Sequence, residues 1–453
     1  MKLKIIGGGL AGCEAAWQAA IRGVEVELYE MRPTVTTEAH RTSHLAELVC
    51  SNSLGSNLPN RASGLLKSEL RTLNSLLIRC ADASSLPAGG ALAVDREKFS
   101  ICVQKALETH PKIRIIRQEV AAIPESPAIL ATGPLTSHAL SSALAAFTGE
   151  EHLYFYDAIA PIVHRDSIDM SIAFRANRYG QEDSKEGDYI NCPLTETEYQ
   201  RFRLALLNAE RIPIRDFEAE VESGVKAGQG QYFQGCQPVE VIAAAGEKSL
   251  AFGPMRPVGL TDPRTGRWPY AVVQLRQDNL AGDLYNLVGF QTNLTYQEQA
   301  KVFRMIPGLE NAVFERYGQM HRNSFLASPV LLNSALEFKQ KRGLFVAGQL
   351  AGIEGYAGNI ASGLVSGINA VNYCRGVEPL SLPLTTMTGA LVHYITHADI
   401  KGFQPTKAMF GLLPQPDDDI RRSKRVRFEY YANRAQDDLR VFLQSNQDIL
   451  DIN

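Results

Sequence analysis

The stretch from Lys2 to Gly12 constrains the fold of this chain more than any other. It reads KLKII followed by GGGLAG, and the alanine-rich run after it has high helical propensity and ends at Gly23. An apolar run, a glycine turn and a helix form the unit that holds the phosphates of a dinucleotide at a helix N-terminus. The chain is therefore expected to begin with a Rossmann-like α/β domain.

The glycine turn supplies the first candidate binding residues. Gly7 permits the tight turn, Gly9 lets the backbone approach a pyrophosphate, and Gly12 lets helix and strand pack closely. The strand VEVELYE then ends at Glu30, whose carboxylate is expected to accept a ribose hydroxyl. The other interpretation is a glycine-rich loop without a ligand. The candidate dinucleotide-binding residues here are Gly7, Gly8, Gly9, Leu10, Ala11, Gly12 and Glu30.

Two later segments indicate which dinucleotide is bound. An apolar strand at 128–130 runs into ATG, which ends at Gly133, and GLFVAGQLAGIEGY brings Gly348 and Tyr356 before a long helix of small residues. Such a late strand and helix resemble the flavin end of FAD proteins with two dinucleotide folds, in which a helix N-terminus faces the flavin ring. We expect FAD rather than free NAD. Tyr356 is expected either to stack on a flat ligand or to belong to the core.

The middle of the chain has a different pattern. Short alternating runs at 270–276 and 284–291 predict strands of a mainly antiparallel sheet. The predicted architecture is a discontinuous FAD-binding domain, residues 1–165 and 325–453, with an inserted α+β domain at 166–324 that carries the substrate side.

Composition and cysteine spacing exclude several classes of protein. The net charge of -3 requires any polyanion site to be a local basic patch. Seven cysteines without a C-x-x-C pair predict reduced thiols rather than a disulfide framework or a metal site. With no apolar run of transmembrane length and no signal-peptide pattern, we expect a cytoplasmic protein without a membrane partner.

Two cysteines lie at the edges of turns. Cys50 follows an apolar run, interpreted as a short helix or strand, and precedes Ser51, Asn52 and Ser53, which favour turns and caps. Cys236 lies between a glycine and a nearby proline. A thiol displayed in this way can have a lowered pKa and meet a ligand, whereas a buried one is inert.

Several motifs together resemble one family. They are LVCSNSLGSN, GDYINCPL, YFQGCQPVE, FGPMRPVGLTDPRTG, AVVQLRQDN, LVGFQTNL, HRNSF and GLFVAGQLAGIEGY. With these motifs the chain is similar to the folate- and FAD-dependent tRNA (uracil-5-)-methyltransferases, the TrmFO family, which is related to the wobble-uridine-modifying flavoprotein MnmG. The resemblance runs through almost the whole chain.

The resemblance implies a reaction and two catalytic residues. The enzyme would methylate C5 of uridine 54 in the tRNA T loop, with 5,10-methylenetetrahydrofolate as carbon donor and FAD reduced by NAD(P)H. Uracil C5 is a poor nucleophile, but a thiolate that adds to C6 produces an enolate whose C5 can attack a methylene electrophile. The family pattern implies Cys236 as this nucleophile and Cys50 as its partner near the flavin.

Two alternatives remain from the residues alone. One is a flavin-dependent oxidoreductase acting on a small molecule or thiol, and the other is a tRNA-binding flavoprotein without turnover. For tRNA contact, a basic run with interleaved aromatics at 421–431 and the stretch FRANRYG at 174–180 are the candidates. The competing interpretation of the first is a charged helix face with its aromatics packed inward.

Overall fold

The first sheet is parallel and carries the glycine turn on its central strand. In this computed structural model its order is β16-β7-β1-β2-β6, and every neighbouring pair is parallel. The strands are β1 (Lys2–Ile6), β2 (Glu25–Glu30), β6 (Ile113–Arg117), β7 (Ala128–Leu130) and β16 (Leu344–Val346). Residues more than 300 positions apart thus share one sheet, which confirms the predicted α/β class with a discontinuous Rossmann-like domain.

The structure describes residues 2–37, 39–149, 153–158, 160–178, 187–212, 237–318, 320–417, 420 and 423–447. For 153–158, 320–324 and 402 it describes the backbone alone.

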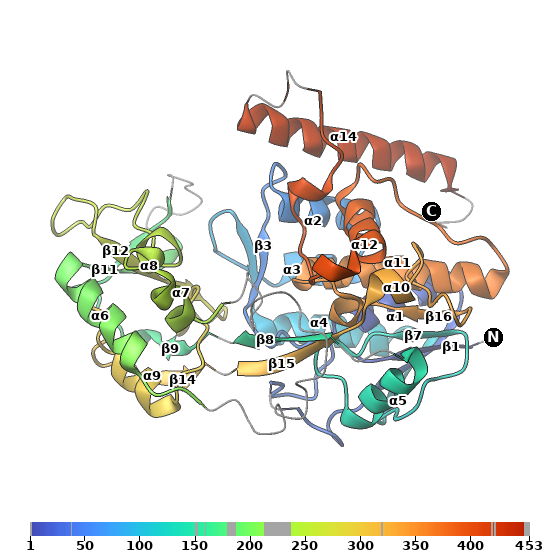
Figure 1. The fold of residues 1–453 in the computed structure, drawn as a ribbon, viewed down its shortest axis with the longest axis horizontal. Helices are drawn as coiled ribbons and strands as arrows, with labels where there is room; N and C mark the ends of the chain where they lie inside the picture. Colours follow the sequence, from blue (N-terminus) through green and yellow to red (C-terminus); the bar gives the residue numbers. More distant parts are fainter. Residues whose placement is uncertain are drawn as a thin grey trace.

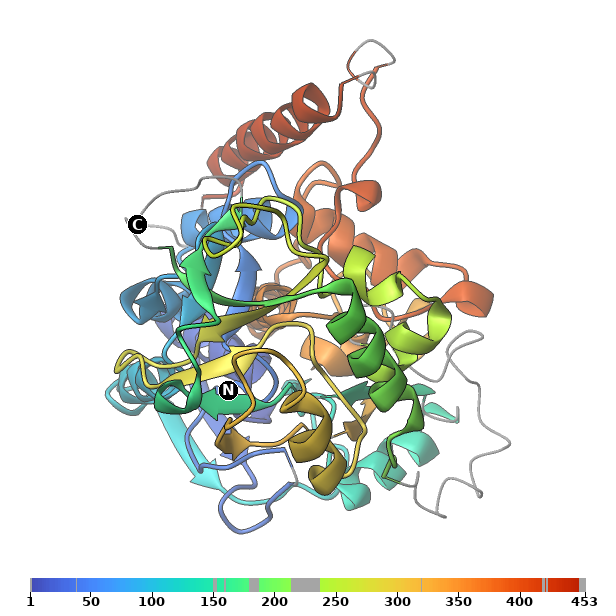
Figure 2. The ribbon, with the colours of Figure 1, turned by 90° about the vertical axis from the view of Figure 1, so that its left-hand side faces the viewer.

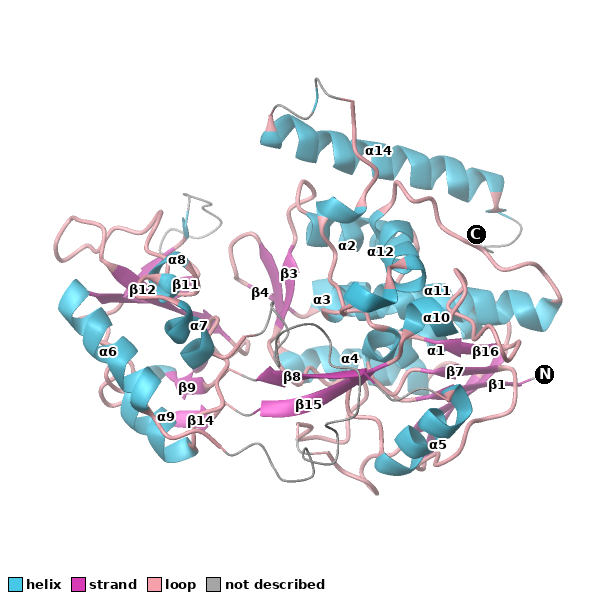
Figure 3. Ribbon diagram, in the orientation of Figure 1, coloured by secondary structure: helices cyan, strands magenta, loops and turns pink. Residues whose placement is uncertain are grey.

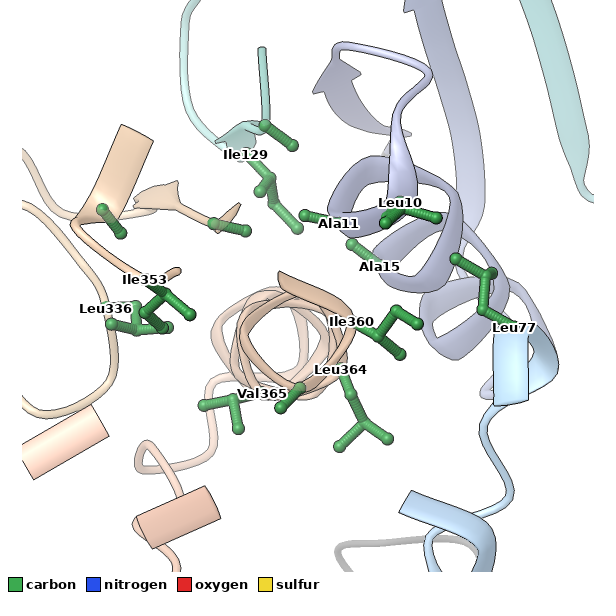
Figure 4. Close-up of a cluster of buried hydrophobic side chains, with 14 of the residues drawn as sticks. Leu10, Ala11, Ala15, Leu77, Ile129, Leu336, Ile353, Ile360, Leu364 and Val365 are labelled. Atoms are coloured by element: carbon green, nitrogen blue, oxygen red, sulfur yellow. The ribbon is translucent and has the colours of Figure 1, made fainter. Parts of the chain in front are cut away.

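Helices cover the parallel sheet (Figure 1). The helices of this domain are α1 (Leu10–Ile21), α2 (Ala62–Thr72), α3 (Leu76–Ala83), α4 (Arg96–Glu108), α5 (His138–Thr148), α10 (Ser328–Leu331), α11 (Tyr356–Arg375) and α12 (Met387–His397). Of these, α1, α4 and α11 contact the strands of the parallel sheet directly. Small residues set how closely α11 approaches α1, because a Cβ at Gly363 would lie 2.2 Å from the Ala11 carbonyl oxygen. Figure 4 shows the apolar contact that results, with Ile360 extending toward the side of α11 where α1 and Leu77 lie. The glycine-rich composition of α11 is therefore a packing requirement.

A second sheet lies apart from the first and has its own core. Its order is β10-β11-β12-β13-β9-β14, antiparallel throughout, and helices pack against it (Figure 3). The strands are β9 (Ile162–His164), β10 (Phe174–Ala176), β11 (Tyr189–Leu194), β12 (Ala271–Gln277), β13 (Leu284–Leu287) and β14 (Phe314–Arg316). The helices are α6 (Glu196–Asn208), α7 (Val239–Ala245), α8 (Ser249–Phe252) and α9 (Tyr296–Phe303). This confirms the mainly antiparallel inserted domain. Its exact bounds stay a prediction, and β9 of the second sheet begins before residue 166.

Two smaller sheets connect these bodies. Strands β8 (Leu153–Ala158) and β15 (Met320–Phe325) pair antiparallel and lie between the two larger sheets (Figure 1). The other is β3-β5-β4, formed by β3 (Ser53–Ser56), β4 (Ser85–Leu86) and β5 (Ala91–Val94). Because β3 begins three residues after Cys50, this sheet helps to place residues 49–51, called the thiol segment below, between the two domains.

The long helix α14 (Lys424–Ser445) lies outermost on the first domain. It runs above α2 and α12 in Figure 1 and projects beyond the body at the top of Figure 2. Among the described residues, none of the helices has the length and apolar character that would let it cross a membrane.

Candidate active site

A large cavity opens at the carboxyl ends of the parallel strands, beside the N-termini of α1 and α11. It encloses about 1000 Å³ of space, part of it open to solvent, which suits a dinucleotide. Nine of the ten candidate cofactor residues line it: Gly7, Gly8, Gly9, Leu10, Ala11, Glu30, Gly133, Gly348 and Tyr356. Gly12, the tenth, does not. The structure thus brings together residues from three distant segments, and their binding role stays a prediction.

Gly12 acts in the packing of the turn. A Cβ at this position would lie 1.8 Å from the Gly7 carbonyl oxygen, so no side chain fits between α1 and β1. Gly7 has a φ of +109°, which favours glycine. Around Gly9 the described residues leave room, since a Cβ there would meet nothing within 4 Å. As no side chain caps α1, its first N–H groups are available to a phosphate.

Glu30 is held by protein groups on the cavity wall. Its carboxylate accepts from the Gly8 N–H at 3.0 Å and pairs with Arg32 at 2.9 Å. Burial raises the pKa of this carboxyl, but the Arg32 guanidinium and the backbone donors outweigh it, so the pKa is lowered overall. Arg32 also pairs with Glu47 at 3.0 Å. An ionised Glu30 in a fixed position is compatible with the predicted hydrogen bond from a ribose hydroxyl.

The start of α11 forms the opposite wall. Gly348 (φ +79°) donates its N–H to Ser362 Oγ at 2.7 Å, and Gly355 (φ +81°) begins the helix without a side-chain cap. The Asn359 side-chain oxygen is buried and has no hydrogen-bond partner among the described residues. Since Asn359 lines the cavity, this acceptor is available to a donor on a bound ligand.

Cys50 lies on an irregular segment beside this cavity. The expectation of a short helix or strand at 45–50 is wrong, because Ala46 adopts a φ of 53° and donates its N–H to the Gly8 carbonyl at 2.9 Å. This contact ties the segment to the glycine turn. The backbone then passes Val49, which lines the cavity, and leaves Cys50 partly exposed.

Tyr356 connects the cavity wall to the thiol segment. Its hydroxyl accepts the N–H of Cys50 at 2.9 Å and that of Ser51 at 3.2 Å. Burial raises the pKa of this hydroxyl, and negative charge at Cys50 raises it further, so Tyr356 is neutral at physiological pH. Of the two roles expected for Tyr356, the structure favours neither alone: the residue lines the cavity and packs against the core.

Three arginines hold the same segment from other elements. Arg316 Nη2 donates to the Val49 carbonyl at 2.6 Å, and Arg96 Nη2 donates to the Cys50 carbonyl at 3.1 Å. Arg276 Nη2 donates to Ser51 Oγ at 3.2 Å. Arg96 begins α4, whereas Arg276 and Arg316 belong to the second sheet. The thiol segment is therefore clamped by both domains.

The remaining cysteines behave differently. Cys236, the other candidate catalytic residue, lies outside the described residues. Cys13 and Cys192 are fully buried, and burial raises the pKa of both thiols. Among the described residues no group of three potential ligands could hold a metal ion.

The basic residues expected to contact tRNA lie partly within and partly outside the described residues. Lys424 and Arg425 are exposed at the start of α14, while Arg421 and Arg422 lie outside the described residues. Tyr431 is 2% exposed and packs against Phe410, as expected for inward-facing aromatics. In the other stretch, the Arg175 and Arg178 guanidinium groups bond to Tyr285 and Gln274 within the second sheet.

Sequence reasoning missed the charged groups around the glycine turn and the thiol. Most of them carry no motif, because they are isolated arginines and polar residues on separate elements. The residues missed in this way are Arg32, Glu47, Arg96, Arg276, Arg316 and Asn359. Arg276 could have been sought as a charge inside a strand that is otherwise largely buried.

The fold and the cavity define a dinucleotide-binding α/β protein with an inserted domain. The family model for glucose inhibited division protein A (GIDA) matches residues 2–378. Among solved structures, GidA from Aquifex aeolicus in the form II crystal shares the fold, with a TM-score of 0.70 and 17% identity. The match covers 97% of this chain and 73% of that one.

Curated relatives narrow this class. Methylenetetrahydrofolate--tRNA-(uracil-5-)-methyltransferase TrmFO from Anoxybacillus flavithermus is 52% identical over 444 residues, 98% of this chain and 100% of the relative. The protein of the same name from Enterococcus faecalis is also 52% identical, over 98% of this chain and 99% of its own length. The chain belongs to the TrmFO family within the wider GIDA family.

Proposed function

We propose that this protein is a folate-dependent tRNA methyltransferase. It transfers the one-carbon unit of 5,10-methylenetetrahydrofolate to C5 of uridine 54 in the T loop, with FAD reduced by NAD(P)H. The proposal is supported by relatives of this name at 52% identity over almost the whole chain. The observation that carries it is the position of Cys50, a partly exposed thiol bonded through its backbone to Tyr356 on the cavity wall.

The cavity fits FAD. The uncapped start of α1 and the open space at Gly9 suit a pyrophosphate, and the buried acceptor of Asn359 suits a ring N–H donor. Glu30 would accept the ribose hydroxyl. When bound, FAD supplies the two-electron chemistry that reduces the transferred carbon to a methyl group. The protein contributes orientation, exclusion of water and the groups that move protons.

The two candidate thiols have distinct proposed roles. Cys236 attacks uracil C6, and Cys50 is its partner on the cofactor side. The clamp on residues 49–51 supports the second role, because it fixes a thiol beside the cofactor cavity and between the domains. If Cys236→Ala still formed a covalent complex with a T-arm RNA containing 5-fluorouracil, Cys236 could not be the nucleophile.

The protein is expected to meet tRNA in the cytoplasm. We propose that the exposed start of α14, with Lys424 and Arg425, contacts tRNA phosphates. NAD(P)H acts as a diffusible reductant.

A methyl-transfer assay tests the function directly. Purified protein is incubated with unmodified tRNA transcript, NAD(P)H and methylenetetrahydrofolate labelled at the transferred carbon. Label in 5-methyluridine that disappears without folate is the expected result. A protein that binds FAD but transfers no label would instead be a small-molecule oxidoreductase or a non-catalytic tRNA binder.

A further inference from the structure

Three guanidinium groups converge on three consecutive residues. Arg316, Arg96 and Arg276 bond, in this order, to the Val49 carbonyl, the Cys50 carbonyl and the Ser51 hydroxyl, at 2.6, 3.1 and 3.2 Å. Holding a loop requires hydrogen-bond donors, which amide or hydroxyl side chains could also provide. Three full positive charges on the residues around one thiol therefore indicate an electrostatic role.

Nearby carboxylates balance the positive charge only in part. Asp278 pairs with Arg96 at 3.1 Å, and its negative charge also acts on Arg276. Among the described residues, neither Arg276 nor Arg316 lies within 4.0 Å of a carboxylate oxygen.

The other titratable groups facing the segment do not change this balance. The Tyr356 hydroxyl is neutral, and so is that of Tyr189, which faces Arg276 and whose pKa is raised by burial. Glu47, three residues before Cys50, is paired with Arg32. Arg41 adds further positive charge beside Arg316.

Arg316 is the member of the cluster whose charge is least compensated. Its side chain is 8% exposed, and its Nε atom has no hydrogen-bond partner among the described residues. Burial lowers the pKa of Arg316 to about 10, and the positive charges of Arg96 and Arg41 act in the same direction. A buried cation in this condition is stabilised by a neighbouring anion.

Ionised Cys50 is an anion in the required position. Its negative charge raises the pKa of all three guanidinium groups, although burial is the largest effect on each of them. Electrostatic coupling is reciprocal, so three cations that are stabilised by a negative sulfur also stabilise that negative sulfur.

We propose that Arg96, Arg276 and Arg316 are positioning residues that hold the Cys50 sulfur as a thiolate in the resting enzyme, with Arg316 supplying the unbalanced charge. The thiol proton leaves to solvent and the sulfur keeps the electron pair. The inference deepens the proposed function, since a thiolate beside the cofactor is ready either to accept a proton or to attack without a separate base.

The test measures the sulfur itself. FAD-loaded protein is treated with iodoacetamide from pH 5.5 to 9.5, and modification of the Cys50 peptide is followed by mass spectrometry. The variants are Arg316→Gln, which removes the charge, and Arg316→Lys, which keeps it. Arg440→Gln is the matched control, because Arg440 is exposed on α14 and far along the chain from the cluster.

The expected result is a shift of the Cys50 profile to higher pH in Arg316→Gln. A shift of one pH unit slows alkylation by about tenfold at pH values below both the wild-type and the variant pKa. Arg316→Lys restores most of the rate, and Arg440→Gln matches the wild type. Arg276→Gln gives a second reading of the same effect, should Arg316→Gln fold poorly.

If the pH dependence of Cys50 alkylation is unchanged in folded Arg316→Gln and Arg276→Gln, the proposal is overturned, even if methyl transfer falls. A merely structural role of these arginines would reduce activity without changing that pH dependence. The two proposals can fail separately. If the wild-type protein transfers no methyl group but the Cys50 profile still shifts in Arg316→Gln, the thiolate proposal stands and the proposed function is wrong.

Discussion

The Tyr356 hydroxyl accepts the Cys50 backbone N–H at 2.9 Å, although 306 positions separate the two residues in the chain. Tyr356 is the first residue of α11, the helix that completes the cofactor domain. One hydroxyl thus joins the late cofactor segment to the early thiol segment. The position of the thiol depends on assembly of the cavity.

Replacing Tyr356 with Phe should disturb the thiol segment while leaving the cavity wall in place. The N–H groups of Cys50 and Ser51 lose their common acceptor, which costs about 1–3 kcal/mol when such donors stay buried. We expect FAD content close to the wild type and a fall in the methyl-transfer rate at saturating tRNA. The check is kcat alongside flavin absorbance. Normal kcat would mean that water or another group replaces the hydroxyl.

A pair of glycine substitutions separates packing from ligand contact. Gly12→Ala places a Cβ 1.8 Å from the Gly7 carbonyl oxygen, so it should lower thermal stability and abolish FAD binding. Gly9→Ala meets no protein atom within 4 Å, and Gly9 has an extended backbone (φ −79°) that alanine adopts readily. It should fold normally and still lose FAD affinity. The measurements are melting temperature and flavin titration, and full FAD binding by Gly9→Ala would place the pyrophosphate elsewhere.

The parallel sheet and the cofactor cavity were predictable because their signals are local. A glycine turn between a strand and a helix leaves few backbone solutions, and the same holds for the segment around Gly348. The predicted strand at 128–130 coincides with β7. Steric requirements of this kind depend on consecutive residues, so the sequence alone reveals them.

The clamp around Cys50 was not predictable for the converse reason. Arg96, Arg276 and Arg316 come from separate elements, and only Arg276, inside an apolar strand, differs in the sequence from an ordinary surface charge. Their convergence depends on how the two domains pack. The irregular path at 45–50 was missed because its apolar residues suit a helix or strand equally, whereas a tertiary contact between Ala46 and Gly8 decides the outcome.

Cys192 predicts a specific dependence of stability on pH. Burial raises the pKa of its thiol above the ordinary value of 9.0, so the folded state keeps the proton when the unfolded chain loses it. The contribution to stability is complete below pH 9 and is lost as the pH rises above it. The free energy of unfolding, measured with urea from pH 7 to 10.5, should therefore decrease less for Cys192→Ala than for the wild type. Equal decreases in the two proteins would show that Cys192 does not cause the pH dependence.

Cys80 and Cys102 are positioned to form a disulfide under oxidising conditions. Their Sγ atoms lie 2.7 Å apart, on the adjacent helices α3 and α4. With diamide as oxidant, the two thiols should give up two protons and two electrons and close a loop between positions 22 residues apart, stabilising the fold by about 3 kcal/mol. Peptide mapping and melting curves measure the result. Cys102→Ser is the control, and diamide-treated wild type without an 80–102 crosslink would refute the prediction.

The start of α14 predicts how tRNA binding depends on salt. Lys424 and Arg425 are exposed there, and Arg421 and Arg422 precede them in the chain. Replacing all four with Ala should weaken tRNA binding and flatten the dependence of log K on log salt, since each lost phosphate contact removes about 0.7–0.9 from the slope. Filter binding from 50 to 300 mM salt provides both quantities. Arg440→Ala with Lys301→Ala serves as a control for loss of exposed charge elsewhere, because Lys301 lies on α9 of the second domain. A four-residue variant with the wild-type slope would show that tRNA phosphates are held by another surface, even if its affinity were lower.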